Sequence, residues 1–167
     1  TILKFFQYKF FFDNKDKFHI RKMICPTKSY SPSLNENSLA DLNSIIKTTV
    51  DKKNFFKIDI EGHEYRILDQ IKKYSSSMNG LAIEFHNCDL HSDKIKNFIN
   101  NFELQLVHIH VNNWALVNSD NSPRVIELIF STKDFNKKIT NFQKKFPISM
   151  DVPNNPLYED LSIEFND

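Results

Sequence analysis

Apolar runs alternate with helix-like segments over much of this sequence, and the alternation limits the fold more than any other feature. Strands that alternate with helices of about 10–14 residues are typical of an α/β fold with a mainly parallel sheet. A chain of 167 residues suits a single domain, so we expect one domain over 1–167. The runs that predict its principal strands are Phe55–Ile60, Gly80–Phe85, Leu104–Val111 and Val125–Phe130.

Weaker patterns predict the remaining elements. Ser38 is expected to cap the helix 38–50, because a serine hydroxyl can accept a hydrogen bond from a helix N-terminal N–H group. The other predicted elements are an amphipathic helix at 1–12, a strand at Phe18–Ile24, a helix at 63–74, a helix that Ser92 caps and a last strand at Leu161–Phe165.

Glycine is scarce, with only Gly62 and Gly80 in the whole sequence. Loops that cradle phosphates or a nucleotide need several closely spaced glycines, because only glycine lets the backbone turn so tightly. The sequence therefore excludes a P-loop or a GxGxxG loop within these 167 residues.

The charge is nearly balanced, with 22 basic and 21 acidic residues. This balance excludes the basic surface that nucleic acids need, and no run of basic residues indicates a membrane anchor. The two cysteines, Cys25 and Cys88, lie far apart and do not form a metal-ligand pair, so we expect a reduced, cytoplasmic protein without a membrane segment.

Ionisable and amide side chains gather where the predicted strands end. A spacing of two residues places both members of a pair on one face of a strand. Burying such groups costs several kcal/mol unless they are paired or bound, so three strands that share this feature predict a site beyond the carboxyl ends of the sheet. The residues are Asp59 and Glu61, Glu84 and His86, His108 and His110, and Asn112 and Asn113.

Structural roles also account for single members of this set. Asp59 and Glu61 could cap the following helix, because acids favour a helix N-terminus. His86 or His108 alone could be a hydrogen-bonded structural histidine. His63 and Glu64 are expected on the surface of the helix.

Five segments resemble the C-terminal half of FkbM-type methyltransferases, with the best match over 38–165. The segments are "KIDIEGHEYRIL", "AIEFH", "LVHIHVNNW", "VIELIF" and "VPNNPLYEDLSIEF". The resemblance implies a Rossmann-like sheet of the class I S-adenosylmethionine-dependent methyltransferases, mainly parallel with an antiparallel last strand. It also implies that the first strands and the glycine-rich cofactor loop lie upstream of Thr1, since this sequence lacks them.

By the same resemblance, the function is O-methyl transfer from S-adenosylmethionine to a small-molecule or glycan hydroxyl, with no assigned metal ligand. The implied catalytic residues are Asp59, Glu84 and His86, and the implied substrate-binding residues are Glu61, His108, His110, Asn112 and Asn113.

Two other functions stay open at this stage. The missing glycine loop favours a non-catalytic remnant or interaction module of the same fold, which could self-associate through the uncovered edge of Phe55–Ile60. Several histidines and carboxylates would also suit Zn²⁺ or Mn²⁺ in a hydrolase-like site.

Overall fold

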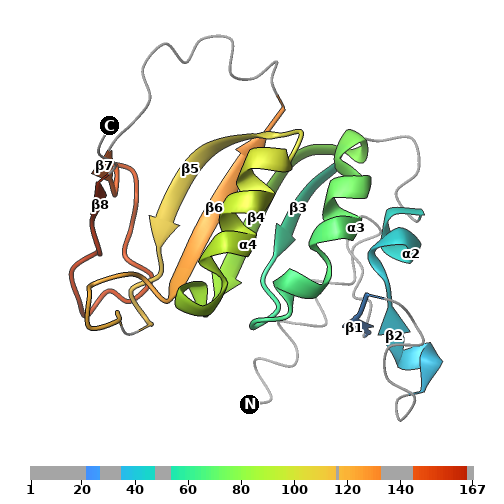
Figure 1. Ribbon diagram of the computed structural model, residues 1–167, viewed down its shortest axis with the longest axis horizontal. Helices are drawn as coiled ribbons and strands as arrows, with labels where there is room; N and C mark the ends of the chain where they lie inside the picture. Colours follow the sequence, from blue (N-terminus) through green and yellow to red (C-terminus); the bar gives the residue numbers. More distant parts are fainter. Residues whose placement is uncertain (1–21, 27–34, 48–53, 116, 133–144, 165–167) are drawn as a thin grey trace, which may run out of the picture. The chain divides into compact units, whose positions relative to one another are not determined.

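The computed structural model describes residues 22–26, 35–47, 54–115, 117–132 and 145–164 (Figure 1). The chain divides into two compact units, Thr1–Asp41 and Leu42–Asp167. The predicted helix at 1–12 and the beginning of the predicted strand Phe18–Ile24 lie outside the described residues. No helix in the described ranges is long and apolar enough to cross a membrane.

The described part of the first unit is a short parallel strand pair. β1 (Met23–Ile24) pairs with β2 (Leu39–Ala40), and the 3₁₀ turn η1 (Glu36–Ser38) leads into β2. The Cys25 N–H extends this pairing by donating to Ala40 O at 2.9 Å.

The predicted start of a helix at Ser38 is wrong. The Ser38 hydroxyl donates to Asn35 O at 2.6 Å, and the Asn35 side chain accepts from the backbone of Asn37. Ser38 therefore closes a turn that Asn35 begins, as short polar side chains often do. The helix of this region, α2 (Leu42–Ile46), begins four residues later.

The second unit contains a four-stranded mixed sheet with the order β3-β4-β6-β5. β4 pairs with β3 in parallel, whereas β6 is antiparallel to both of its neighbours. Three strands therefore run in one direction and β6 runs against them, which confirms an α/β fold whose sheet contains parallel and antiparallel strands. The strands are β3 (Asn54–Ile58), β4 (Met78–His86), β5 (Gln105–Val111) and β6 (Val125–Ser131).

Two helical regions cover one face of this sheet (Figure 1). The predicted helix 63–74 is interrupted at Ile67, which separates the 3₁₀ turn η3 (Glu64–Arg66) from α3 (Leu68–Lys73). A second 3₁₀ turn, η4 (Ser75–Ser77), connects α3 to β4.

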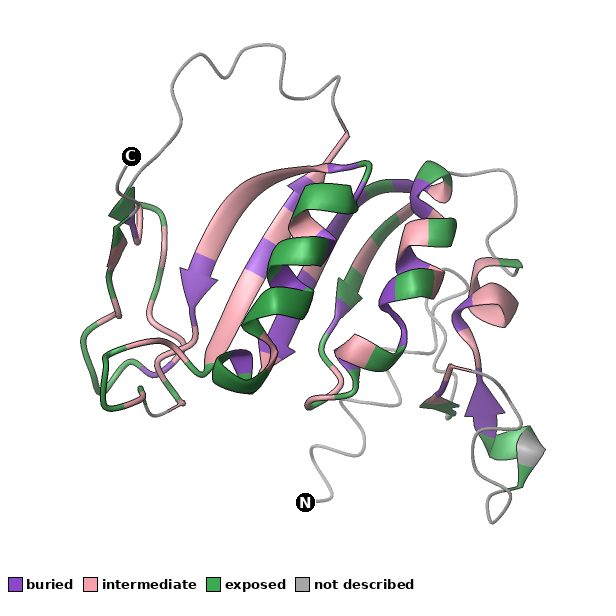
Figure 2. Cartoon of the chain, viewed as in Figure 1, coloured by how far each residue is buried: buried purple, intermediate pink, exposed green. Residues whose placement is uncertain are grey.

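Helix α4 (Cys88–Asn101) begins four residues before the predicted cap at Ser92. His91 has a non-helical backbone (φ −132°), so the helix is kinked there and its regular part begins at Ser92. Figure 2 shows the outer side of α4 exposed and its inner side buried, as the apolar spacing of its sequence predicts.

Four phenylalanines form the centre of the core between α4 and the sheet. Phe98 of α4 meets Phe130 edge to face at 5.6 Å between ring centroids, and it stacks on Phe102 at 4.7 Å. Phe85 of β4 lies 6.0 Å from Phe98 in a second edge contact. Such geometries add about 0.5–1.5 kcal/mol per pair to the burial of the rings.

Gly80 lets β4 fit between its neighbours. A Cβ atom at this position would lie 2.8 Å from a ring carbon of Phe55 and 2.9 Å from the backbone oxygen of Phe130. We expect Gly80→Ala to lower the free energy of unfolding by about 1–3 kcal/mol, measured by urea denaturation. Because the Phe130 oxygen belongs to the backbone, most of this loss should persist in a Phe55→Ala background. Disappearance of the loss in that background would contradict the explanation.

The C-terminal segment, residues 145–164, begins with β7 (Lys145–Phe146) and ends with β8 (Ile163–Glu164). These two strands pair in antiparallel fashion. β8 lies within the predicted strand Leu161–Phe165, whose last residue is outside the described part. The residues between these two strands form turns, bends and irregular chain.

Strand β3 has β4 as its single strand neighbour in the described part of the chain. Its Phe55 side chain is 62 % exposed. Self-association through this edge stays a prediction, since unpaired apolar edges favour strand pairing between chains.

Candidate functional site

The carboxyl ends of β3 and β4 bring the predicted site residues together. The two strands are parallel, and Ile58 pairs with Ile83, so Asp59 leaves β3 beside Glu84. Alternation along β4 places Glu84 and His86 on the same face. Phe85 points to the opposite face, where it packs on α4.

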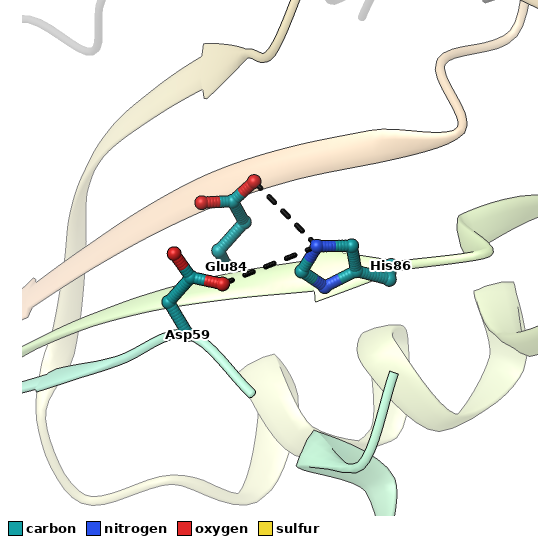
Figure 3. Close-up of side chains that lie close together, drawn as sticks. All are labelled: Asp59, Glu84 and His86. Carbon is teal, nitrogen blue, oxygen red and sulfur yellow. Dashed lines mark ion pairs between the residues drawn. The ribbon is translucent and has the colours of Figure 1, made fainter. Parts of the chain in front are cut away.

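The His86 imidazole lies at the centre of this group, and Figure 3 shows it facing two carboxylates. Its Nε2 atom is 4.0 Å from an oxygen of Asp59 and 3.7 Å from an oxygen of Glu84. An oxygen of the exposed Glu61 lies 3.4 Å from the same nitrogen. The predicted convergence of these four residues is thus observed.

Glu64 fixes the other side of the ring. Its Oε1 atom lies 3.2 Å from His86 Nδ1 and also accepts hydrogen bonds from the backbone N–H groups of Ile60 and Gly62. The side chain is fully buried, so the prediction that Glu64 lies on the helix surface is wrong. The prediction placed Glu64 in the first exposed turn of a helix. In the structure its carboxylate turns back and accepts hydrogen bonds from the N–H groups of Ile60 and Gly62.

The turn after β3 has an unusual backbone. Glu61 and Gly62 both have positive φ angles, 55° and 91°. Glycine adopts such angles freely, whereas a non-glycine residue like Glu61 does so at a cost of about 1 kcal/mol or more. This turn aims the Gly62 N–H at Glu64 and carries Glu61 over His86.

Tyr65 anchors the end of β4. Its hydroxyl donates to His86 O at 2.6 Å. Burial raises the pKa of this phenol, and the neighbouring Cys88 and Glu64 raise it further. The tyrosine is therefore a neutral donor that holds the backbone of His86 in place.

Glu84 is the buried carboxylate of the group. Asn112 Nδ2 donates to its Oε1 at 2.8 Å. Burial raises the pKa of Glu84, and the charges of Asp59 and Glu127 also raise it, whereas the Asn112 hydrogen bond and the charge of His86 lower it. The carboxyl thus holds a proton at higher pH than an exposed glutamate.

An open, mostly polar cavity of about 510 Å³ lies over these side chains. Such a volume suits a small ligand. Lys57 is the single Lys or Arg among the described residues that line it, so carboxylates dominate its charge. The lining residues are Lys57, Asp59, Glu61, Glu84, His86, Asn112, Trp114, Ala115, Val125, Glu127 and Asn154.

The histidines of β5 have another role in the structure. His108 Nε2 pairs with Asp151 at 2.9 Å, and His110 Nε2 pairs with Asp160 at 2.8 Å. Neither histidine lines the cavity, which differs from the expectation that His110 joins the pocket. Both histidines tie the C-terminal segment to the face of β5.

Asn113 makes a similar attachment. Its side chain accepts from the Asn155 N–H at 2.6 Å and donates to the backbone oxygens of Asn155, Tyr158 and Glu159. Asn112 differs from its neighbour because it lines the cavity and binds Glu84. A substrate-binding role for His108, His110 and Asn113 stays a prediction.

Three acidic or amide side chains at the site were not among its predicted residues. Besides Glu64, they are Glu127 of β6 and Asn154 of the C-terminal segment, whose amide donates to Glu127 at 3.0 Å. The signal for Glu127 is present in the sequence, because a lone acid in "VIELIF" repeats the pattern of Glu84 in "AIEF". No comparable signal marks Asn154.

A larger and more apolar hollow, of about 750 Å³, lies between α4 and the neighbouring strands. Ile95, Ile109 and Leu128 are among its lining residues. It lacks a convergent group of ionisable side chains like the one at His86, so the smaller polar cavity is the better candidate for chemistry.

No family model, curated protein or solved structure matches this chain. The methyltransferase resemblance therefore rests on the quoted segments alone.

Proposed function

We propose that this chain is the part of an S-adenosylmethionine-dependent O-methyltransferase domain that binds the methyl acceptor. The domain has a Rossmann-like sheet. In this proposal the cavity over His86 binds a hydroxyl group of a small molecule or sugar, and the surrounding side chains orient it and accept its proton. The observation that carries the proposal is the convergence of His86 with Asp59 and Glu84 at the carboxyl ends of two parallel strands, where α/β folds bind ligands.

The geometry supports proton transfer from a hydroxyl. A general base must lie within hydrogen-bond reach of the proton that it removes. Asp59, Glu84 and His86 each present an acceptor atom to the cavity. The buried Glu64 holds the imidazole ring, so His86 keeps one orientation toward the hydroxyl group that would receive the methyl group.

The described residues do not fit the methyl donor. Gly80 packs between β3 and β6, and Gly62 forms the turn after β3, so neither belongs to a glycine-rich cradle. The proposal therefore concerns acceptor binding and deprotonation and includes no step at the donor.

The test is methyl transfer from S-adenosylmethionine labelled in its methyl group, catalysed by the product of the longest open reading frame that contains this chain. Acceptors would be a panel of monosaccharides and small hydroxylated molecules. We expect His86→Ala and Asp59→Asn each to lower turnover by about 10²-fold or more, the usual scale for an acid–base group. His63→Ala should leave turnover unchanged, because His63 is exposed beside the site.

Thermal unfolding of each variant separates lost chemistry from lost structure. Asp59 is partly exposed, so Asp59→Asn should unfold like the unaltered protein. Turnover that His86→Ala leaves intact would reject the assigned role. A folded protein that neither binds the donor nor transfers methyl groups would instead favour the non-catalytic interaction module.

A further inference from the structure

We propose that His86, Asp59 and Glu84 form a binding site for one first-row divalent cation, such as Mn²⁺ or Zn²⁺. Nε2 of His86 and one carboxylate oxygen from each acid all lie within 4.8 Å of one another (Figure 3). Two ligands of one such ion, with bonds of about 2.0–2.2 Å, lie about 3–4.4 Å apart. The observed 3.7 Å and 4.0 Å separations fall within that span.

The hydrogen bonding of His86 prepares the ring for a cation. His86 Nδ1 lies 3.2 Å from Oε1 of Glu64. In the tautomer that donates from Nδ1 to this oxygen, the lone pair of the ring lies on Nε2, the atom that faces Asp59, Glu61 and Glu84. A carboxylate behind a histidine is the usual arrangement at protein metal sites, because it fixes the ring and makes it a stronger ligand.

Glu64, in contact with the other nitrogen of His86, adds a second observation. The residue is fully buried, and its Oε2 atom has no hydrogen-bond partner in the described part of the chain. A buried carboxylate costs several kcal/mol unless a positive group lies nearby. A cation bound to the opposite nitrogen of His86 would place positive charge on the ring that touches Glu64.

The charges around His86 favour the same conclusion. Three carboxylates face Nε2 and a fourth faces Nδ1, whereas the ring alone supplies at most one positive charge. Lys57 also lines the cavity, but its side chain is exposed. A divalent ion would balance the acids directly, and Glu61 could rotate to become a further ligand.

The ligand set indicates the kind of ion. One imidazole nitrogen with carboxylate oxygens suits Mn²⁺ or Zn²⁺, whereas Mg²⁺ and Ca²⁺ prefer oxygen ligands throughout. The cavity leaves room on the open side for water or for the acceptor hydroxyl of the proposed function. With the ion bound, His86 Nε2 would be a ligand, so the hydroxyl proton would pass to a carboxylate oxygen that does not bind the ion.

The test uses the 167-residue chain after treatment with a chelator and desalting. Mn²⁺ is added, free Mn²⁺ is measured by its electron paramagnetic resonance signal, and electron spin-echo modulation reports a nitrogen ligand. We expect one Mn²⁺ per chain, displaced by Zn²⁺, with a nitrogen signal that His86→Ala abolishes. His86→Ala and Asp59→Asn should each raise the Kd about tenfold or more.

Two further variants sharpen the result. Glu64→Gln should raise the Kd about 10–100-fold, the effect of losing a carboxylate behind a ligand, and should keep the nitrogen signal, because His86 would still bind. His63→Ala is the matched control and should leave the Kd unchanged. If His86→Ala fails to fold by circular dichroism, Asp59→Asn decides the outcome, because Asp59 is partly exposed.

The proposal is overturned if the folded chain binds no Mn²⁺ at about 1 mM, equivalent to a binding free energy of only about −4 kcal/mol. It is also overturned if Asp59→Asn binds as tightly as the unaltered chain, or if His63→Ala weakens binding as much as His86→Ala. Because the measurement requires no methyl donor, metal binding by this chain together with no methyl transfer by the product of the longest reading frame would reject the proposed function alone.

Discussion

Phe98→Ala should lower the free energy of unfolding by about 3–5 kcal/mol, the usual cost of removing a buried aromatic ring. Phe98 is 1 % exposed and contacts the rings of Phe85, Phe102 and Phe130. Its removal would leave a cavity between α4 and the centre of the sheet. Urea denaturation, followed by circular dichroism and by the fluorescence of the single tryptophan, Trp114, measures the loss.

Phe55→Ala is the matched control for this prediction. The same side chain is removed from β3, where Phe55 is 62 % exposed, so the expected loss is about 1 kcal/mol or less. Equal losses in the two variants would contradict the assignment of Phe98 to the centre of the core.

Glu64→Ala should lower the free energy of unfolding by about 3 kcal/mol, because each buried donor left without an acceptor costs about 1–3 kcal/mol. The change would leave the N–H groups of Ile60 and Gly62 and the Nδ1 atom of His86 without their acceptor. Glu64→Gln keeps a carbonyl oxygen at this place, so this variant should lower the free energy of unfolding by only about 1 kcal/mol.

Glu61→Ala provides the comparison at an exposed acid of the same type. The Glu61 side chain is 85 % exposed, and its removal should change stability by less than about 0.5 kcal/mol. If Glu64→Ala lowers the free energy of unfolding no more than Glu61→Ala does, the buried carboxylate does not stabilise the turn after β3. Denaturant titration of the three variants under one set of conditions gives the comparison.

The principal strands could be predicted because each is a compact apolar run with a clear end. β3, β4, β5 and β6 all lie within about two residues of their predicted positions. The errors concern elements that local hydrogen bonds decide. Ser38 has the sequence of a helix cap, but its hydroxyl closes the turn at Asn35 instead.

The site was predictable where the alternation along a strand decides which way a side chain points. This reasoning brought Asp59 to Glu84 and His86, because neighbouring parallel strands end at the same edge. It failed for Glu64, whose carboxylate turns back across a backbone with two positive φ angles. Nor could it find Asn154, because the attachment of a segment distant in sequence has no local pattern.

The strand order also has a consequence for how the molecule is made. β6 lies between β4 and β5, although the ribosome synthesises it after both of them. Among the described strands, β5 therefore has no partner in this sheet until residues 125–131 have emerged. Asp151 and Asp160, the partners of His108 and His110, emerge from the ribosome later still. Asn154 lines the cavity and also emerges late. This part of the cavity wall is thus among the last parts of the site to form in a newly made chain.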